Sequence, residues 1–456
     1  MKYGKMLYAV SFLLICILGN SIYLDAKGGN AIESSVSEFQ NRTNCNSVNI
    51  VVYDDGKVSY YGNGKVDGLY QIGSMTKAFT GLGIMKLVHE GKIVPDNKIS
   101  VYLPEFETYY EGEKVDITVN ELLSQTSGFT NSESKYPSAE ENMTLSGWVK
   151  QISGSELQHR PGEQYAYSNV NYNLLGSIIE NVSGISYKEY MKCEILLPLE
   201  LAHTYVGFPE GEENIVKGTR LGYWNVHPFD LVVREGAIPA GYFYSNINDM
   251  CRWIEIWLGQ ADIPAVYREL IEETKKCFNA DNEYYAGWEY FGEGVIGHSG
   301  GTANYSSRMV FSPERNTGVC VLTNLNVAAS TDRLCNDTLA ITLGEEPSGF
   351  SYDVWTIFDH VFSVITLIGS ILLVVIVTKL NNIRAMVVCD VAGVVLLTGI
   401  LGVMPVIFQS GWGTLLFIWA PWSMLGGITV LLLDVTILSI KIWRWKKREN
   451  HNKKSG

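Results

Sequence analysis

The sequence predicts an α+β domain with one antiparallel sheet and a helical lobe, followed by an all-α bundle of three transmembrane helices. Two observations support the domain: a strand–turn–strand pattern lies near each of its ends, and helical patterns fill the region between them. This order is typical of a single antiparallel sheet with a helical lobe. The bundle is predicted from three long apolar runs near the C-terminus.

The first hairpin pattern comprises 48–53, a turn at 54–56 and 57–61, and the second comprises 307–311, 313–318 and 319–323. Both alternate β-branched or aromatic residues with turn formers, as hairpins do. Apolar residues recur at helical spacing between the hairpins. These helical patterns lie at 75–90, 119–124, 171–183, 187–197 and 246–258.

The three apolar runs, at about 355–378, 385–407 and 414–440, are each long enough to cross a ~30 Å hydrocarbon core. Lys379 and Arg384 lie in the loop between the first two runs, and the tail after residue 440 is basic. The positive-inside rule places this loop and the tail in the cytoplasm and the preceding domain on the opposite side. Asp390 and Asp434 fall within the runs and are either functional acids or residues that reach the interface or pair with Ser or Thr.

An apolar stretch at 7–24 behind two lysines is typical of an export signal. We therefore expect a signal peptide or signal anchor at 1–26 and an extracytoplasmic domain at 27–345. A linker and the three transmembrane helices then occupy 346–440, and a basic cytoplasmic tail occupies 441–456.

The charge of the exported region excludes some classes of partner. Residues 26–352 hold 24 basic and 42 acidic side chains, a net charge of about −18, whereas nucleic acid needs cationic partners. No C-x-x-C spacing occurs among the cysteines, so we expect no metal site and no cofactor. An exported location permits disulfides, but no spacing here fixes a pairing.

The segment 72–79, I-G-S-M-T-K-A-F, contains the strongest chemical signal. Ser74 and Lys77 stand three residues apart at the start of a helical pattern, so they share a helix face. A desolvated lysine has a lowered pKa and can take the serine proton, which makes the hydroxyl a nucleophile. Ser132 and Lys135 have the same spacing, but they lie in a polar stretch that resembles a loop.

Two further segments can complete an active site. In Tyr167-Ser168-Asn169, the phenol can pass the proton from Ser74 to the leaving group, and the amide of Asn169 can orient substrate and Lys77. The second segment, 298–301, is H-S-G-G, whose small residues let a substrate backbone approach a strand edge. The backbone N–H groups of Ser74 and Gly301 are the candidate oxyanion hole.

The segments I-G-S-M-T-K-A-F, I-T-V-N-E-L-L-S-Q-T-S-G-F, P-G-E-Q-Y-A-Y-S-N and G-H-S-G-G-T-A-N-Y-S-S, in this order, resemble the class C β-lactamase and D-peptidase superfamily. The resemblance spans roughly 45–330. It implies the serine β-lactamase/D-peptidase fold, acylation of Ser74, and Lys77 and Tyr167 as the acid–base pair. It further implies Asn169, His298 and Gly300 as substrate-side groups.

One residue departs from this family pattern. The class C β-lactamases carry a lysine where this chain has His298, and a histidine is mostly neutral near pH 7. We therefore expect weaker binding of free carboxylates, which argues against β-lactamase and D,D-carboxypeptidase activity. Asn304 follows in the next loop and is either a substrate contact or a turn residue; Trp224, His227 and Trp288 either line the cleft or belong to the core.

The order of signal, hydrolase domain and three helices resembles the colibactin-maturing peptidases, which remove an N-acyl-D-asparagine cap from a nonribosomal peptide prodrug. This resemblance implies an acylated peptide substrate, the lipid bilayer as a partner, and an export transporter as a further candidate partner. The alternatives are a D-amino-acid peptidase or esterase of the cell envelope, and a non-catalytic β-lactam-binding or sensor protein. A sensor needs a cytoplasmic output domain, and the tail is short and basic.

Overall fold

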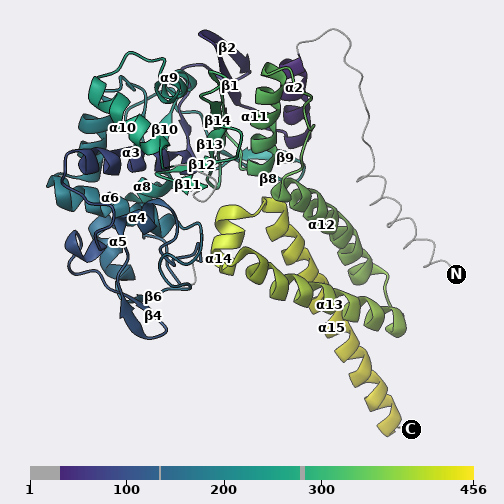
Figure 1. The fold of residues 1–456 in the computed structure, drawn as a ribbon. Helices are drawn as coiled ribbons and strands as arrows, with labels where there is room; N and C mark the ends of the chain where they lie inside the picture. Colours follow the sequence, from purple (N-terminus) through teal and green to yellow (C-terminus); the bar gives the residue numbers. More distant parts are fainter. Residues whose placement is uncertain (1–30, 133–134, 278–282, 456) are drawn as a thin grey trace.

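The computed structural model describes residues 31–132, 135–277 and 283–455. The expected signal at 1–26 lies outside these residues. The central element is a seven-stranded antiparallel sheet with the strand order β11-β12-β13-β14-β15-β1-β2 (Figure 1). Its strands are β11 Tyr284–Tyr285, β12 Trp288–Tyr290, β13 Ile296–Gly301, β14 Ser306–Ser312, β15 Thr317–Thr323, β1 Val48–Asp54 and β2 Lys57–Gly62.

Both predicted hairpins are present, and their strands meet at the centre of the sheet. Val51 of β1 stands opposite Cys320 of β15, so the first and last strands of the domain are neighbours. Alternate residues of β1 point to opposite faces: Val48, Ile50 and Val52 join one apolar cluster, and Val51 joins the other. The sheet is therefore a buried layer that separates two hydrophobic cores.

One face of the sheet packs against α2 Ala31–Thr43 and α11 Ala328–Thr342, and the other faces the helical lobe. The lobe begins with η1 Gly73–Met75 and α3 Thr76–His89. Its other helices are η2 Ile99–Val101, α4 Val119–Leu123, α5 Leu145–Ile152, α6 Asn169–Ser183, α7 Tyr187–Met191, η3 Lys192–Leu196, η4 Glu235–Ala237, α8 Ile238–Gly241, α9 Ile247–Leu258 and α10 Ala265–Lys275. The short outer strands are β3 Tyr70–Gln71, β4 Thr108–Tyr110, β5 Glu113–Val115, β6 Ser155–Glu156, β7 Tyr205–Val206, β8 Thr219–Gly222, β9 Asn225–Pro228 and β10 Phe243–Ser245.

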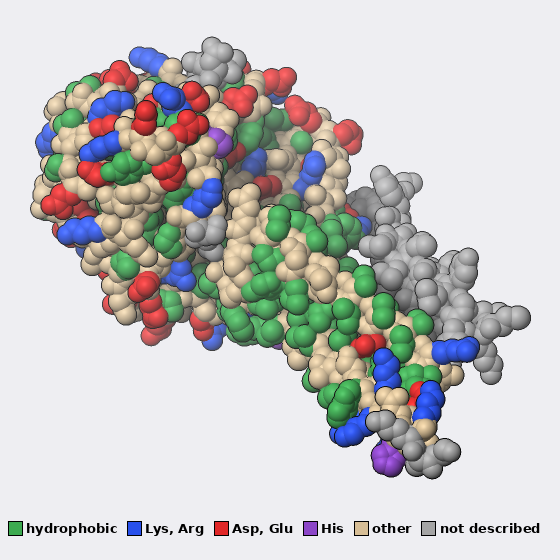
Figure 2. Space-filling view, turned by 90° about the horizontal axis from the view of Figure 1, so that it is seen from below, with side chains coloured by type: hydrophobic (Ala, Val, Ile, Leu, Met, Phe, Trp, Pro, Cys, Tyr) green, Lys and Arg blue, Asp and Glu red, His purple; other side chains and the backbone are tan. Residues whose placement is uncertain are grey.

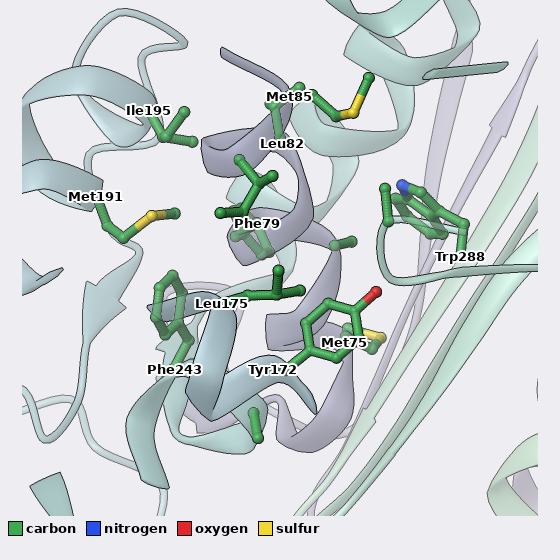
Figure 3. Close-up of a cluster of buried hydrophobic side chains, with 14 of the residues drawn as sticks. Met75, Phe79, Leu82, Met85, Tyr172, Leu175, Met191, Ile195, Phe243 and Trp288 are labelled. Atoms are coloured by element: carbon green, nitrogen blue, oxygen red, sulfur yellow. The ribbon is translucent and has the colours of Figure 1, made fainter. Parts of the chain in front are cut away.

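Helix α3 is buried on nearly every side, which fixes the start of the helix in place. Phe79 stacks on Trp253 with ring centroids 4.2 Å apart, and Figure 3 shows Leu82 and Met85 continuing the same cluster along the helix. Figure 3 also places Trp288 beside α3, and this residue is buried core, as one of the two sequence interpretations held. A rigid, enclosed helix is a precise support for side chains at its first turn.

The three apolar runs form long helices: α12 Val354–Thr378, α13 Ile383–Phe408 and α15 Trp422–Ser455. In Figure 2 the bundle at the lower right is covered mainly by hydrophobic side chains, with Lys and Arg at its tip. The prediction of one helix over 414–440 is wrong at its start. Here α14 Trp412–Thr414 and η5 Leu415–Trp419 end two residues before Pro421, whose missing N–H cannot continue a helix.

Asp390 and Asp434, the two acids noted within the apolar runs, have different surroundings. Asp390 accepts hydrogen bonds from Ser439 Oγ at 3.1 and 3.2 Å, which is one of the alternatives considered for it. Asp434 is buried beside Gly369 of α12. The seven cysteines within the described residues form no disulfide bond with one another.

Candidate active site

Ser74 and Lys77 meet at the junction of η1 and α3. Lys77 Nζ lies 2.9 Å from Ser74 Oγ, as the three-residue spacing predicts. The Lys77 side chain is completely buried, whereas Ser74 is partly exposed. The serine hydroxyl is therefore open to a substrate while its neighbouring amine is shielded from water.

The second S-x-x-K segment has no such geometry. Lys135 is exposed, and its Nζ donates a hydrogen bond to Gln158 Oε1. The backbone N–H of Lys135, not its side chain, donates a hydrogen bond to the Ser132 carbonyl oxygen at 3.1 Å. The Lys135 amine is thus directed to Gln158 and not to the Ser132 hydroxyl, so this pair lacks the geometry of a serine with its base.

Three hydrogen bonds hold the Lys77 amine in place. Besides Ser74, its Nζ donates to Asn169 Oδ1 at 2.8 Å and to the Ala240 carbonyl oxygen at 2.6 Å. Burial lowers the pKa of Lys77 well below 10.5, and the carboxylate of Glu289 opposes this shift in part. A lysine in this setting can exist as a neutral amine near pH 7 and accept the Ser74 proton.

Tyr167 and Asn169 reach the site from the start of α6. The Ser168 hydroxyl caps this helix by accepting the N–H of Val170, which fixes both neighbours. Tyr167 hydrogen bonds with the Ser74 side chain, and its ring centroid lies 4.9 Å from Lys77 Nζ. Burial raises the pKa of Tyr167 above 10, and the Ser74 hydrogen bond lowers it by less. The phenol is consequently protonated and suited to donate or relay a proton.

Glycines allow the backbone just before α3 to lie directly against β13. Gly73 has φ +51°, and a methyl group on it would lie 2.5 Å from the Gly301 amide nitrogen. A methyl group on Gly300 would lie 2.1 Å from the Ile72 carbonyl oxygen, to which Ser307 Oγ also donates at 2.8 Å. The backbone segments that carry the amides of Ser74 and Gly301 are thus in direct contact. Their function as an oxyanion hole stays a prediction.

The edge of β13 is open beside this contact. Strand β12 pairs with β13 only at Ile296 and Gly297, whereas β14 pairs with it as far as Gly301. The residues from Ser299 to Gly301 therefore extend beyond β12, and this free edge gives a substrate backbone room to approach.

His298 lies behind the site rather than on its open side. Its Nδ1 is 2.6 Å from the Ser299 carbonyl oxygen, and its Nε2 is 3.2 Å from the Tyr284 hydroxyl. Burial, together with a smaller effect of the nearby Lys77 amine, lowers the pKa of His298 to about 3. His298 is therefore neutral at pH 7, as the sequence analysis expected, and direct substrate contact by its ring stays a prediction.

Asn304 is buried and satisfied by protein groups. Its Nδ2 donates to the Phe229 carbonyl oxygen at 2.9 Å, and its Oδ1 accepts from Thr302 Oγ1 at 3.2 Å. These bonds support the turn-residue alternative.

Four contributors to the site carried no recognisable sequence signal. The Ala240 carbonyl and Asn131, which accepts from Asn169 Nδ2 at 3.2 Å, come from loops distant in sequence. Tyr284 and Glu289 surround His298 from β11 and β12. A backbone carbonyl has no side-chain signature, and the short strands β11 and β12 were not predicted.

A cavity of about 460 Å³ opens beside Ser74 and extends to the bundle of apolar helices. Asn169 and Gly301 line it together with Ser74. Residues 130–132 and 136–139, parts of the segment 231–242, and residues 301–303 belong to its domain wall. Its opposite wall comes from the bundle and is mostly apolar: Trp355, Phe408, Gln409, Ser410, Leu415, Ile418 and Trp419.

The β8–β9 hairpin fastens this wall to the domain. The buried Arg220 donates to the carbonyl oxygens of Ala420 at 2.5 Å and Phe417 at 2.9 Å and also to that of Leu416, and burial lowers its pKa to about 10. The turn residues Tyr223 and Trp224 each donate a backbone N–H to the Asp359 carboxylate at 2.8 Å. The end of the bundle that contains Asp359 and residues 416–420 is therefore bound to the α+β domain. The contact uses one buried charged side chain from each part, Arg220 from the domain and Asp359 from the bundle.

Comparisons with known proteins agree with this geometry. The family model described as Beta-lactamase matches residues 32–343. Protein flp of Staphylococcus aureus is 33% identical over 278 residues, which are 56% of this chain and 53% of that protein. Penicillin-binding protein 4* of Bacillus subtilis is 27% identical over 272 residues, or 54% of this chain and 58% of that protein. The chain thus spans little more than half the length of these curated relatives.

Solved structures give the same fold. The octameric penicillin-binding protein homologue from Pyrococcus abyssi has a TM-score of 0.61 and 25% identity, covering 73% of this chain and 80% of that one. A class C beta-lactamase has a TM-score of 0.59 and 18% identity, covering 72% of this chain and 99% of that one. The α+β fold expected from the sequence is thereby confirmed, with the three apolar helices following it.

Proposed function

Because this chain belongs to the beta-lactamase family, whose model matches residues 32–343, we propose that it is a membrane-anchored serine peptidase that acts through an acyl-enzyme on Ser74. The observation that carries the proposal is the 2.9 Å contact between the partly exposed Ser74 hydroxyl and the buried amine of Lys77. Burial favours the neutral amine, which is the form that can accept a proton.

In the first step Ser74 Oγ attacks the scissile carbonyl carbon and its proton moves to Lys77 Nζ. The N–H groups of Ser74 and Gly301 stabilise the developing oxyanion. Tyr167 passes the proton to the departing amine nitrogen, whose bond to the carbonyl carbon breaks. Water then attacks the Ser74 ester by the reverse route, which releases the acid and restores the serine hydroxyl.

We infer that the preferred substrate is a peptide with an N-acyl-D-amino-acid cap, with D-Asn as the residue, removed from a nonribosomal peptide prodrug. The apolar bundle wall of the cavity supports an acylated substrate, because a fatty chain gains free energy on leaving water for such a surface. The basic residues after 440 and in the loop 379–384 support a cytoplasmic tail and an extracytoplasmic hydrolase domain.

Product analysis tests the substrate. The full-length protein and its Ser74→Ala variant each meet N-myristoyl-D-Asn amide, its L-Asn twin and a D-Ala-D-Ala peptide, and mass spectrometry identifies the products. We expect Ser74-dependent cleavage of the D-Asn compound alone. Cleavage of D-Ala-D-Ala instead would reassign the protein to cell-wall peptide hydrolysis.

A D-amino-acid peptidase or esterase of the cell envelope is the second candidate. It is favoured by the 27% identity to a penicillin-binding protein of Bacillus subtilis, together with the neutral state of His298. Covalent labelling by a fluorescent phosphonate separates both candidates from a binding or sensor protein. An intact protein that is not labelled at Ser74, beside a labelled control hydrolase, would favour the non-catalytic alternative.

A further inference from the structure

Arg234 is the only charged side chain among the described residues that line the cavity next to Ser74. It stands immediately before η4 and six residues before Ala240, whose carbonyl oxygen holds Lys77. A short segment, buried at its far end from Ile238 to Ala240, thus connects the arginine to the group that holds the Lys77 amine.

The guanidinium of Arg234 forms no hydrogen bond or ion pair with the part of the chain that the structure describes. The nearest acid along the chain, Glu235, is already bound to Lys188 Nζ at 2.7 Å. By contrast, Arg308 near the site bonds Ser299 Oγ at 2.6 Å and Asn336 Oδ1 at 3.0 Å. Arg234 therefore keeps its five donors available to a molecule in the cavity.

Within the part of the chain that the structure describes, no other cationic side chain lines the cavity. Ser74 Oγ, Asn169 Oδ1 and the Ala240 carbonyl oxygen enclose the Lys77 amine, and burial lowers the pKa of Lys77 and brings that of His298 to about 3. Residues 26–352 carry an excess of acidic groups, so an anion entering the site meets repulsion except near Arg234. A single cation in an acidic domain therefore determines where a negatively charged group of the substrate binds.

We propose that Arg234 binds a carboxylate of the substrate, on the helical-lobe side of the cavity. This rests on the peptidase function proposed above and names the chemistry of the substrate. The planar guanidinium matches a carboxylate through two parallel hydrogen bonds. One cation balances the single charge of a carboxylate, whereas a phosphate of about −1.5 to −2 would leave excess negative charge in this acidic domain. The cation for the carboxylate thus comes from the segment before η4, whereas residue 298, which is a lysine in the class C β-lactamases, lies on β13.

The test uses a matched pair of compounds, N-myristoyl-D-Asn-Gly with a free carboxylate and the corresponding glycinamide. The full chain in nonionic detergent should favour the carboxylate compound in kcat/KM by about 10- to 100-fold. Arg234→Gln should bring this ratio close to 1, and Arg234→Lys should restore part of it. Arg315→Gln is the control, because it removes an exposed arginine in the β14–β15 turn and should leave the ratio unchanged.

Binding of both compounds to the Ser74→Ala protein, measured by calorimetry, gives a readout independent of turnover. A wild-type ratio close to 1 in cleavage and in binding would overturn the inference, even if Ser74-dependent cleavage upheld the peptidase function. If neither compound is cleaved, the peptidase proposal for D-Asn substrates fails. The affinity ratio alone then decides whether Arg234 selects carboxylates.

Discussion

At the scale of single residues, burial determines the charges around Ser74. The same desolvation that lowers the pKa of Lys77 also lowers that of His298 and raises that of Tyr167. In each of the three groups this shift favours the uncharged form. The site consequently contains a base and a phenolic acid close to the serine without a fixed charge on either.

The pH dependence of kcat/KM should report Lys77. Activity should rise with pH along a limb whose apparent pKa lies well below 10.5, because only the neutral amine accepts the Ser74 proton. Lys77→Arg stays protonated at accessible pH and should lower kcat about a thousandfold. Lys86→Arg is the control: Lys86 lies on the same helix in an ion pair with Glu194 at 2.8 Å. A Lys77→Arg enzyme with the wild-type rate and profile would refute the base assignment.

His298 should make the protein acid-sensitive. Its pKa is about 3 when folded and 6.5 otherwise, so between these values the unfolded chain binds more protons and stability falls as pH falls. From pH 6.5 to 5, the wild type should lose about 2 kcal/mol more than His298→Asn. Urea unfolding of both proteins at several pH values measures this difference. Parallel stability curves would show that His298 is not buried as a neutral ring.

At the scale of elements, the site depends on the contact between the start of α3 and the open edge of β13. Glycines at 73 and 300 permit it, since no side chain fits between the two segments. The contact brings together an element near the beginning of the domain and one near its end. Ser307 of β14 strengthens it by bonding the Ile72 carbonyl oxygen.

Gly73→Ala should separate these two elements. The added methyl group would lie 2.5 Å from the Gly301 amide nitrogen, and φ at this position is +51°, so Ser74 and Gly301 must move apart. We expect kcat to fall by at least about 100-fold. Gly56→Ala, in the β1–β2 turn, has φ +86° but open space around the new methyl group, so it reproduces the backbone strain alone. Equal activities of the two variants would contradict the account.

The β8–β9 hairpin should control how firmly the bundle wall is held. Arg220→Met leaves three carbonyl groups without their donor and should destabilise the docked bundle end by at least about 3 kcal/mol. Hydrogen exchange at residues 415–420 should accelerate accordingly. Arg252→Met removes comparable bonds to the Leu199 and Asp262 carbonyls within the lobe and should leave exchange at 415–420 unaltered. Unchanged exchange in Arg220→Met would remove the anchoring function.

At the scale of the whole molecule, the cavity is shared by two parts of different character. The hydrolase domain supplies the reactive groups and the acidic exterior, and the bundle supplies an apolar wall and a hydrophobic exterior (Figure 2). Buried charged contacts at the β8–β9 hairpin join the two parts. This arrangement suits a substrate that has both an apolar chain and a polar peptide.

The proposed sidedness is testable on intact cells. Protease added outside should digest the hydrolase domain and spare an epitope placed after residue 456. In inverted membrane vesicles the result should reverse, because the epitope is then the exposed part. Loss of the epitope in intact cells would place the tail outside and contradict the orientation inferred from the basic residues.

The sequence allowed the fold class to be predicted because hairpins and buried helices have strong periodic patterns. Helices α2 and α11 were not predicted, since their sequences are rich in polar residues and their burial depends on packing against the sheet. Likewise, the third apolar run reads as one helix until Pro421 is placed at a bend between two pieces.

For the site, local spacing was enough to bring Ser74 and Lys77 together and to place Tyr167 and Asn169 at a helix start. It could not reveal Glu289, Tyr284 or Arg234, because their positions depend on contacts between segments distant in the chain. The neutral state of His298 was expected from its ordinary pKa, but the degree of its burial was not.

The most direct test of the central claim is intact-protein and peptide mass spectrometry of the full chain after rapid quenching with N-myristoyl-D-Asn amide or, in parallel, with a phosphonate. The account predicts one covalent adduct, located on the peptide that contains Ser74 and absent from the Ser74→Ala protein. An adduct on Ser132, or no adduct with either compound while a control hydrolase is modified, would contradict it.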